Sequence, residues 1–242
     1  MIKSLAIVAV FVGLGLGRAN PAHAGFDEGL AAAQRGDFAA ALREWKPLAE
    51  KGHAGALFNL GLMYADGRGV ARNDEWAVSL FRQAAELDHA YAQMNLAVAY
   101  KTGKGVKQDN AESVKWFRKV AEKGHSGAQF NLAIAYLKGL GVKRDPAQAA
   151  EWFAKAADKG LNIAQYNLGR AYETGDGVPK DEVQALKWYG LAAITFPPGA
   201  GRDAAAAARN NLSSNMEKPQ AREAEAQVRS WIRRHSAKSK RK

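Results

Sequence analysis

The chain of 242 residues contains no cysteine. This absence excludes disulfide bonds, thiolate nucleophiles and cysteine ligands for a metal. An exported chain without disulfides must be stable through its hydrophobic core alone. Long hydrophobic runs are also scarce. The one such run covers about residues 5–16, which is shorter than the roughly 20 residues that a membrane-spanning helix needs.

This short apolar run has the features of an export signal. Lys3 supplies a positive start, and the run is followed by Ala22-His23-Ala24, an A-x-A cleavage motif. This order is typical of a secretory signal peptide, so we predict that residues 1–24 are removed and that the mature chain begins at Gly25. We therefore expect an exported bacterial protein, periplasmic or secreted, with no integral membrane segment after signal removal.

The formal net charge is +11, and the basic residues concentrate near the C-terminus. The last ten residues hold six cations and no acid: Arg233, Arg234, Lys238, Lys240, Arg241 and Lys242. A short basic end of this kind is usually solvated, so residues 236–242 are predicted to form a disordered tail. Contact of the tail with cell wall or another anionic polymer stays open. The remaining chain is nearly balanced in charge, and no nucleic-acid partner is expected.

A unit of 36 residues repeats four times without a gap, over residues 54–89, 90–125, 126–161 and 162–197. In the first unit Tyr64 precedes the turn Gly67-Arg68-Gly69-Val70, and the later units keep this order. A fixed period of this size predicts stacked units that share one elongated core. Residues 25–53 have the pattern of a degenerate first repeat with a shorter turn, and residues 198–235 that of C-terminal capping helices.

Each unit has the apolar spacing of two helices joined by a glycine-bent turn. On a helical wheel Ala56, Leu60 and Tyr64 share the packed face, and Gly61 is small because another helix crosses there. Glycine in the turn suits the left-handed stop of the first helix. The expected caps of the second helices are Asn73, Asp109, Asp145 and Asp181.

The pattern A-x-x-x-L-G-x-x-Y-x-x-G-x-G-V, followed by an acid and then by A-x-x-W-x-x-A-A, resembles the Sel1-like repeat. That family is a longer-turned relative of the tetratricopeptide repeat, and the resemblance covers residues 54–197. It implies an all-α solenoid of stacked helix hairpins in a right-handed superhelix. Exported relatives act as assembly scaffolds, regulators of envelope signalling or host-interaction factors.

The repeat accounts for the motifs that otherwise resemble catalytic or cofactor sites. No strand precedes the G-x-G turns, so they are not nucleotide loops. His53, His89 and His125 occupy equivalent places in successive units, about 8–10 Å or more apart, whereas one metal needs its nitrogens near 2 Å. Lys101-Thr102-Gly103 matches K-T-G, but no S-D-N accompanies it. We therefore expect no enzyme activity, no metal and no cofactor.

The first helix of each repeat also has a face turned away from the predicted core. The predicted partner-binding residues there are Phe58, Asn59, Leu62, Met94, Asn95, Phe130, Asn131, Tyr166, Asn167 and Arg170. Regularly spaced apolar side chains that face solvent suggest a partner, and an Asn amide can hold a peptide backbone. A second interpretation also stays open, in which the Asn row bonds neighbouring helices and the apolar row completes the packing.

We therefore expect a non-enzymatic scaffold that binds a protein or peptide along its concave face. The alternative is a cell-wall or polysaccharide binder or hydrolase, β-lactamase-like activity included, which would act through the same groove and the basic tail. Aromatic rows also stack on sugars, so the row from Phe58 to Tyr166 does not discriminate between the two.

Overall fold

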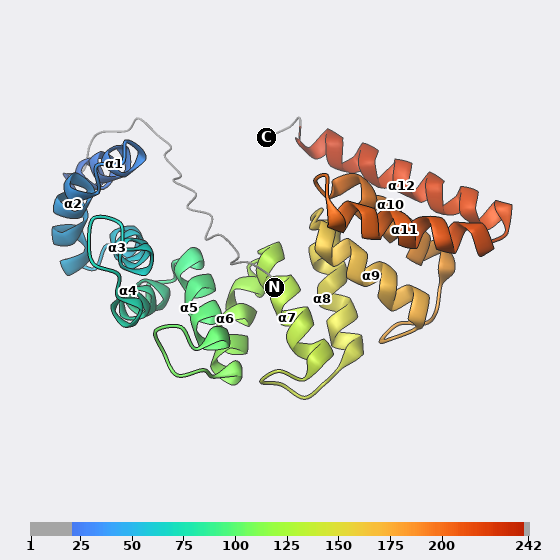
Figure 1. The fold of residues 1–242 in the computed structure, drawn as a ribbon, viewed down its shortest axis with the longest axis horizontal. Helices are drawn as coiled ribbons and strands as arrows, with labels where there is room; N and C mark the ends of the chain where they lie inside the picture. The colour runs from blue at the N-terminus through green and yellow to red at the C-terminus, as the bar shows by residue number, and fades with distance from the viewer. Residues whose placement is uncertain (1–20, 240–242) are drawn as a thin grey trace. The chain divides into compact units, whose positions relative to one another are not determined.

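The structure is a computed structural model, and it describes residues 21–239. These residues form twelve α-helices and no strand, which confirms the all-α repeat solenoid (Figure 1). The helices are α1 (Pro21–Gln34), α2 (Phe38–Glu50), α3 (Ala54–Asp66), α4 (Asp74–Glu86), α5 (Ala90–Thr102), α6 (Asn110–Glu122), α7 (Ser126–Lys138), α8 (Pro146–Asp158), α9 (Asn162–Thr174), α10 (Glu182–Thr195), α11 (Ala200–Asn215) and α12 (Lys218–Ser239).

The chain divides into two compact units, Met1–Gln108 and Asp109–Lys242. Within the described part, the first unit holds α1 to α5 and the second holds α6 to α12. Consecutive helices pack as hairpins in each unit, α3 on α4 in the first and α7 on α8 and α9 on α10 in the second. Helices α3, α5, α7 and α9 are the first helices of the four repeats, and α4, α6, α8 and α10 are the second helices.

The two glycines of each turn have different structural roles. The first one, such as Gly67 with φ of 71°, ends the first helix in the left-handed conformation. The second one lies against the backbone of the preceding repeat: a β-carbon at Gly105 or Gly141 would collide with the carbonyl oxygen of Asp74 or Asn110. Asp74 and Asn110 begin α4 and α6, so the turn of one repeat packs on the second helix of the repeat before it.

The predicted caps of the second helices are confirmed. The Asn73 side chain accepts a hydrogen bond from the backbone N–H of Trp76 at 2.9 Å, and Asp109, Asp145 and Asp181 cap their helices in the same way. The histidine row is also placed at helix starts. The Nδ1 atoms of His53 and His89 accept from the backbone N–H groups of Ala56 and Ala92 at 3.2 Å. These histidines are polar residues at the turns between repeats, as expected.

The close helix crossing predicted at Gly61 is present. A β-carbon there would collide with the ring of Phe81 in α4, and one at Gly169 would collide with the ring of Tyr189 in α10. Ala97 and Ala133 hold the equivalent places in the other repeats and are fully buried. In the first and fourth repeats the glycine of the first helix therefore makes room for an aromatic ring of the second helix.

Additional helices cover the ends of the repeats. In the hairpin of α1 and α2, the buried Trp45 packs over Gly29 and donates from Nε1 to the carbonyl oxygen of Phe26 at 3.2 Å. Helices α11 and α12 both pack on α10, with Ala224 and Trp231 of α12 buried (Figure 1).

The predicted C-terminal tail differs in part from the structure, and the predicted signal peptide stays a prediction. Helix α12 continues to Ser239, so the prediction of a disordered tail from residue 236 is wrong for residues 236–239. No Pro or Gly follows Pro219 to stop the helix. Residues 240–242 lie outside the described residues. So do residues 1–20 of the predicted signal peptide, while α1 begins at Pro21 and spans the expected cleavage junction. None of the described helices is long and apolar enough to cross a membrane.

Candidate partner-binding face

The aromatic row of the first helices faces the core rather than the solvent. Phe58 is 7% exposed, and its ring centroid lies 5.9 Å from that of Phe81 in α4. In the same way, the ring centroid of Phe130 lies 5.9 Å from that of Phe153 in α8. The predicted outward orientation of this row is therefore wrong. The physical reason is that α3, α7 and α9 each pack on the second helix of their own repeat and on the second helix of the hairpin before it. Two sides of each of these first helices are therefore buried.

The other members of the row behave in the same way. Tyr166 lies 5.5 Å from Tyr189 between ring centroids, Leu62 is buried, and Met94 is partly buried. Asn59 is buried as well. These four side chains therefore contribute mainly to packing, and a role for them in binding a partner stays a prediction.

The remaining asparagines hydrogen-bond to their own helix. The Nδ2 atom of Asn95 donates to the carbonyl oxygen of Tyr91 at 2.9 Å, Asn131 donates to Gly127 at 2.9 Å, and Asn167 donates to Ile163 at 2.7 Å. The two predicted roles of the asparagine row were partner binding and bonding between neighbouring helices. Neither included this hydrogen bond to the carbonyl four residues earlier. It fixes the amide on the surface of the helix and uses one of its two N–H groups. Partner binding by the row stays a prediction.

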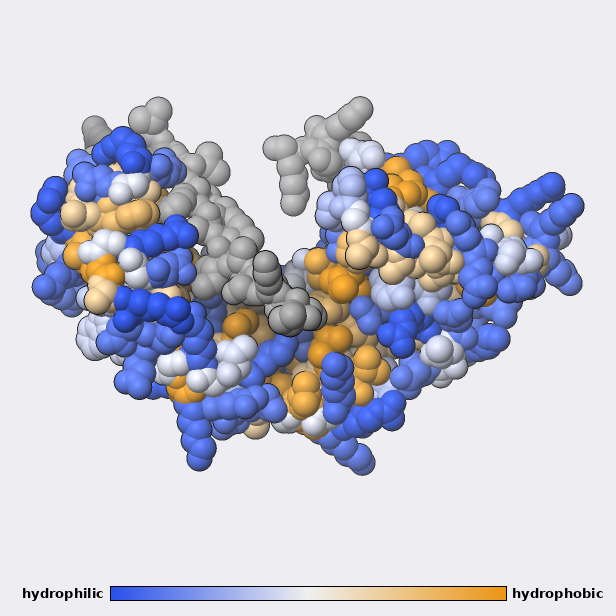
Figure 2. Space-filling view, viewed as in Figure 1, coloured by the Kyte–Doolittle hydropathy of each residue, from blue (hydrophilic) through white to orange (hydrophobic). Residues whose placement is uncertain are grey.

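The solvent-facing side of α5, α7 and α9 is a stripe that runs through the asparagine of each helix. In α5 it consists of Tyr91, Asn95, Val98 and Thr102, in α7 of Gly127, Asn131, Ile134 and Lys138, and in α9 of Ile163, Asn167, Arg170 and Thr174. We call these positions the outward stripe. Three of its apolar members are exposed, with Tyr91 at 39%, Val98 at 42% and Ile163 at 38%, whereas Ile134 is half-buried. On the face drawn in Figure 2, hydrophobic patches interrupt the hydrophilic surface of each unit.

Tyr91 and Ile163 were missed by the sequence reasoning, although a signal for them exists. On the wheel used above, the place four residues before the asparagine falls near ~260°, between the places of Leu62 and Asn59. Gly55 and Gly127 occupy this place in the first and third repeats, so no continuous apolar row is visible there.

Two of the predicted residues, Asn167 and Arg170, line one pocket of the second unit. The pocket has a volume of about 60 Å³ and lies between α7, α8 and α9. Its apolar lining includes Leu137, Ala150 and Phe153, and its polar lining includes Thr174 and Asp176. The other predicted residues do not line it. We call it the Arg170 pocket.

The acids near Arg170 already have partners. Tyr189 donates from its hydroxyl to Glu173 Oε2 at 2.5 Å, and burial together with this carboxylate raises the pKa of the Tyr189 phenol. Asp176 pairs with Arg144 Nη2 at 3.4 Å. Arg170 itself is exposed and forms no ion pair within residues 21–239. It is therefore a free cation on the outward stripe.

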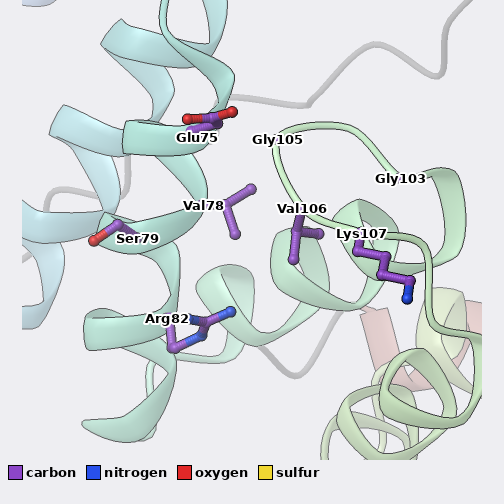
Figure 3. A pocket seen from close by; sticks show the side chains of 8 residues that line it. All are labelled: Glu75, Val78, Ser79, Arg82, Gly103, Gly105, Val106 and Lys107. Atoms are coloured by element: carbon purple, nitrogen blue, oxygen red, sulfur yellow. The ribbon is translucent and has the colours of Figure 1, made fainter.

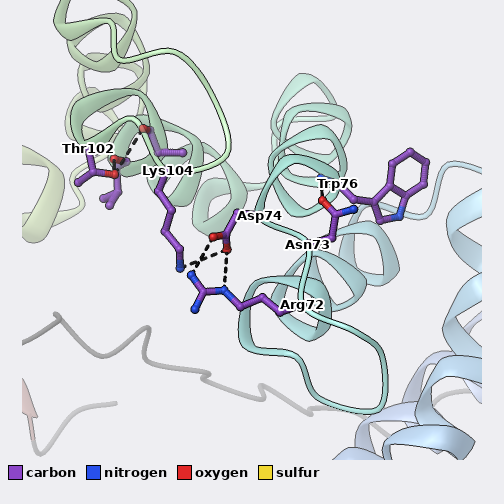
Figure 4. Close-up of polar contacts among 8 residues, drawn as sticks. Arg72, Asn73, Asp74, Trp76, Thr102 and Lys104 are labelled. Carbon is purple, nitrogen blue, oxygen red and sulfur yellow. Dashed lines mark hydrogen bonds and ion pairs between the residues drawn. The ribbon is translucent and has the colours of Figure 1, made fainter.

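The contact between the first and second repeats is equivalent to the one between Arg144 and Asp176, but it has different charged residues (Figure 4). There Asp74 lies between two cations, with Arg72 Nη2 at 2.7 Å and Lys104 Nζ at 3.4 Å. The hydrogen bond from Arg72 lowers the pKa of the Asp74 carboxyl. In the second unit Pro146 replaces Asp74 and Asp176 replaces Lys104. In the first unit the preceding repeat supplies the acid, Asp74, and the following repeat supplies the cation, Lys104. In the second unit the preceding repeat supplies the cation, Arg144, and the following repeat supplies the acid, Asp176, so the two charges are exchanged.

A wider depression of about 450 Å³ lies in the first unit between α4 and the turn after α5 (Figure 3). Val78 and Val106 form part of its lining, with Glu75 and Lys107 exposed beside them. Arg82 also lines it, but its Nη2 donates to the Tyr100 hydroxyl at 2.9 Å. None of the predicted partner-binding residues lines this depression, and its charges are of both signs. Within residues 21–239, no group of three or more His, Asp or Glu side chains could hold a metal ion.

The hairpin repeats, their double-glycine turns and their capped second helices define a class of α-solenoid, and comparison with known proteins identifies it. The Sel1 repeat model matches residues 54–89, 90–125, 126–161 and 162–194. The chain belongs to the Sel1 repeat family. Sel1 repeats generally form non-catalytic scaffolds that bind other proteins.

Two solved structures are similar to this chain over 88% of its length. One is a protective antigen present in uropathogenic Escherichia coli strains, which displays an SLR fold, with 35% identity and a TM-score of 0.75. The other is a Sel1 repeat protein from Oxalobacter formigenes, with 30% identity, a TM-score of 0.69 and 84% of its own chain covered. This chain spans 45% of the length of the E. coli antigen. No curated protein matches it.

Proposed function

We propose that this protein is an exported Sel1 repeat scaffold that binds a protein or peptide through the outward stripe of its first helices. The observation that carries the proposal is the exposure of Tyr91 and Val98 on the stripe of α5 and of Ile163 on the stripe of α9. The free energy of the system falls when a partner covers exposed apolar side chains, so such side chains favour binding. The surface asparagines beside them supply polar groups for a peptide backbone.

Export is supported by the sequence features of residues 1–24, namely Lys3, the short apolar run and the A-x-A motif. The similarity to an E. coli protein described as a protective antigen agrees with this proposal, because an antigen that protects must be accessible to the immune system.

The polysaccharide alternative relied on the aromatic row of the groove as well as on the basic tail. Sugars stack on open ring faces, whereas the rings of Phe58, Phe130 and Tyr166 pack against other rings of the fold. This observation favours a protein or peptide over a sugar polymer as the partner.

The test is a selection of peptides from a random library displayed on phage, with the purified chain as bait. The affinity of each selected peptide is then measured by fluorescence polarisation against Val98→Ser and Ile163→Ser. Both variants should weaken binding by about fivefold or more, because each removes apolar contact from the stripe. The matched control is Leu87→Lys, which alters an apolar side chain that is 51% exposed outside the stripe.

Leu87→Lys should change the affinity by less than about twofold. Lys123 and Lys159 hold the same place in later repeats, so the substitution suits the fold. If the control weakens binding as much as the stripe variants do, or if neither stripe variant has an effect, the proposed binding face is wrong.

A further inference from the structure

The third and fourth repeats depart from the earlier ones at residues that meet in the Arg170 pocket. Arg170 stands where the earlier first helices carry the aliphatic side chains Leu62, Val98 and Ile134. Pro146, another lining residue, stands where Asp74 and Asn110 begin the earlier second helices. Stacking of the repeats does not require these changes, since α4 and α5 pack without them. Their convergence on one pocket indicates a local function.

The interior of the pocket is apolar and small. Ala150 of α8 lies where α4 and α6 carry Val78 and Val114, so the side chain at this place is shorter than in the earlier repeats. Phe153 and Leu137 add apolar wall. The volume of about 60 Å³ holds roughly four to six waters at about 10–15 Å³ each. That space suits the four heavy atoms of a leucine side chain.

The rim of the pocket carries one cation, Arg170, which forms no ion pair within residues 21–239. Glu173 accepts a hydrogen bond from the Tyr189 hydroxyl and Asp176 pairs with Arg144, so the direct partners of both acids are groups other than the Arg170 guanidinium. A guanidinium group binds a carboxylate with two parallel hydrogen bonds, a geometry that lysine does not provide. The ligand group that complements this rim is therefore a carboxylate.

We propose that the Arg170 pocket binds an acidic peptide segment in which an aliphatic side chain stands next to Asp or Glu. The aliphatic side chain enters the pocket beside Ala150, the carboxylate pairs with Arg170, and the Asn167 amide lies within the same lining to contact the peptide backbone. This inference rests on the proposed function, because it specifies the chemistry of the partner at the outward stripe of α9.

The probe is the peptide acetyl-Gly-Ser-Leu-Asp-Ser-Gly-amide, titrated into the ¹⁵N-labelled full mature chain and followed by NMR. The backbone amides of residues 167–174 should shift. Replacing the peptide's Asp by Asn, or its Leu by Ser, should each weaken binding about tenfold. Arg170→Gln should weaken the Asp peptide about tenfold and leave the Asn peptide unchanged. Ala150→Val should abolish the preference for Leu over Ser.

Each variant has a matched control. Lys143→Gln removes an equal charge from an exposed place of the same unit outside the pocket, and it should leave the affinity within about twofold. Ala150→Val introduces the residue found at this place in the first two repeats, so the fold should accept it. Thermal melts of all variants should agree with wild type within about 2 °C, which separates loss of binding from loss of folding.

Equal weakening by Arg170→Gln and Lys143→Gln would show only general attraction between charges and would overturn the proposal. Undiminished binding of the Asn or Ser peptides, or amide shifts elsewhere in the chain, would overturn it as well. If peptides selected on phage depend on Ile163 but ignore Arg170→Gln and Ala150→Val, this inference fails while the proposed function stands. If no peptide of any composition depends on the stripe, the proposed function fails with it.

Discussion

The stability of the first unit should depend on the protonation of His89. Its Nδ1 atom accepts the Ala92 N–H at 3.2 Å, and its ring lies 4.7 Å from that of Phe58. Burial, with a smaller contribution from the charge of His53, lowers the pKa of His89 below its usual 6.5. A proton on Nδ1 also removes the acceptor that caps α5. The unfolded chain therefore binds the proton more tightly, and stability falls as the pH drops below about 6.5.

The magnitude follows from the cap. Loss of an N-cap acceptor costs about 1 kcal/mol, and that change shifts the melting midpoint of a chain of this size by about 2–4 °C. The perturbation is His89→Asn, which keeps a capping oxygen but does not titrate. Melting midpoints at pH 7.5, 6.5 and 5.0 should fall less in this variant than in wild type, by about 2–4 °C at the lowest pH.

The control is His125→Asn, since the His125 side chain makes no cap hydrogen bond. This variant should change the pH slope less than His89→Asn does, because it removes no cap hydrogen bond. The reasoning is refuted if His89→Asn and wild type lose stability in parallel between pH 7.5 and 5.0, or if His125→Asn flattens the slope as much.

Three further predictions concern packing, turns and export. Phe117→Ala should cost about 3–5 kcal/mol in denaturant melts, because its ring is buried in the second unit, whereas exposed Lys143→Ala should stay within about 0.5 kcal/mol; equal costs would disprove the assignment of the core. Gly141→Ala should destabilise by more than about 2 kcal/mol, because it combines a φ of 72° with a collision against the Asn110 backbone. Gly52→Ala, with a φ of 79° and open space around it, should cost only about 1 kcal/mol, and the reverse order would contradict the close contact. Mass spectrometry of the native protein should give a chain that begins at Gly25, and a membrane-bound form that retains residues 1–24 would exclude the predicted cleavage.

The local elements could be predicted from the sequence because their causes are local. Gly67 ends a helix through its own backbone freedom. Asn73 caps the next helix because its side-chain oxygen accepts from the backbone N–H of Trp76, three residues later. Gly61 was predictable for a related reason, since a small residue on an apolar face indicates a close crossing.

The orientation of Phe58 could not be obtained in the same way. A wheel drawn for one helix does not show how many neighbours surround it, and the ring of Phe81 lies 23 positions further along the chain. The Arg170 pocket could not be predicted from the sequence for a similar reason. It forms where Pro146 and Arg170 of different repeats approach each other, and only the fold establishes that proximity.

The exchanged charges between neighbouring repeats have a consequence for the order in which the repeats can stack. Lys104 meets Asp74 of the repeat before it, whereas Asp176 meets Arg144. If the second repeat were joined behind the third, Lys104 would face Arg144, and two cations would oppose each other. Exposed pairs contribute only about 0–1 kcal/mol each, so this effect biases the order without enforcing it. The four units are therefore similar in shape but not interchangeable, and a shuffled or swapped array would be less stable than the native order.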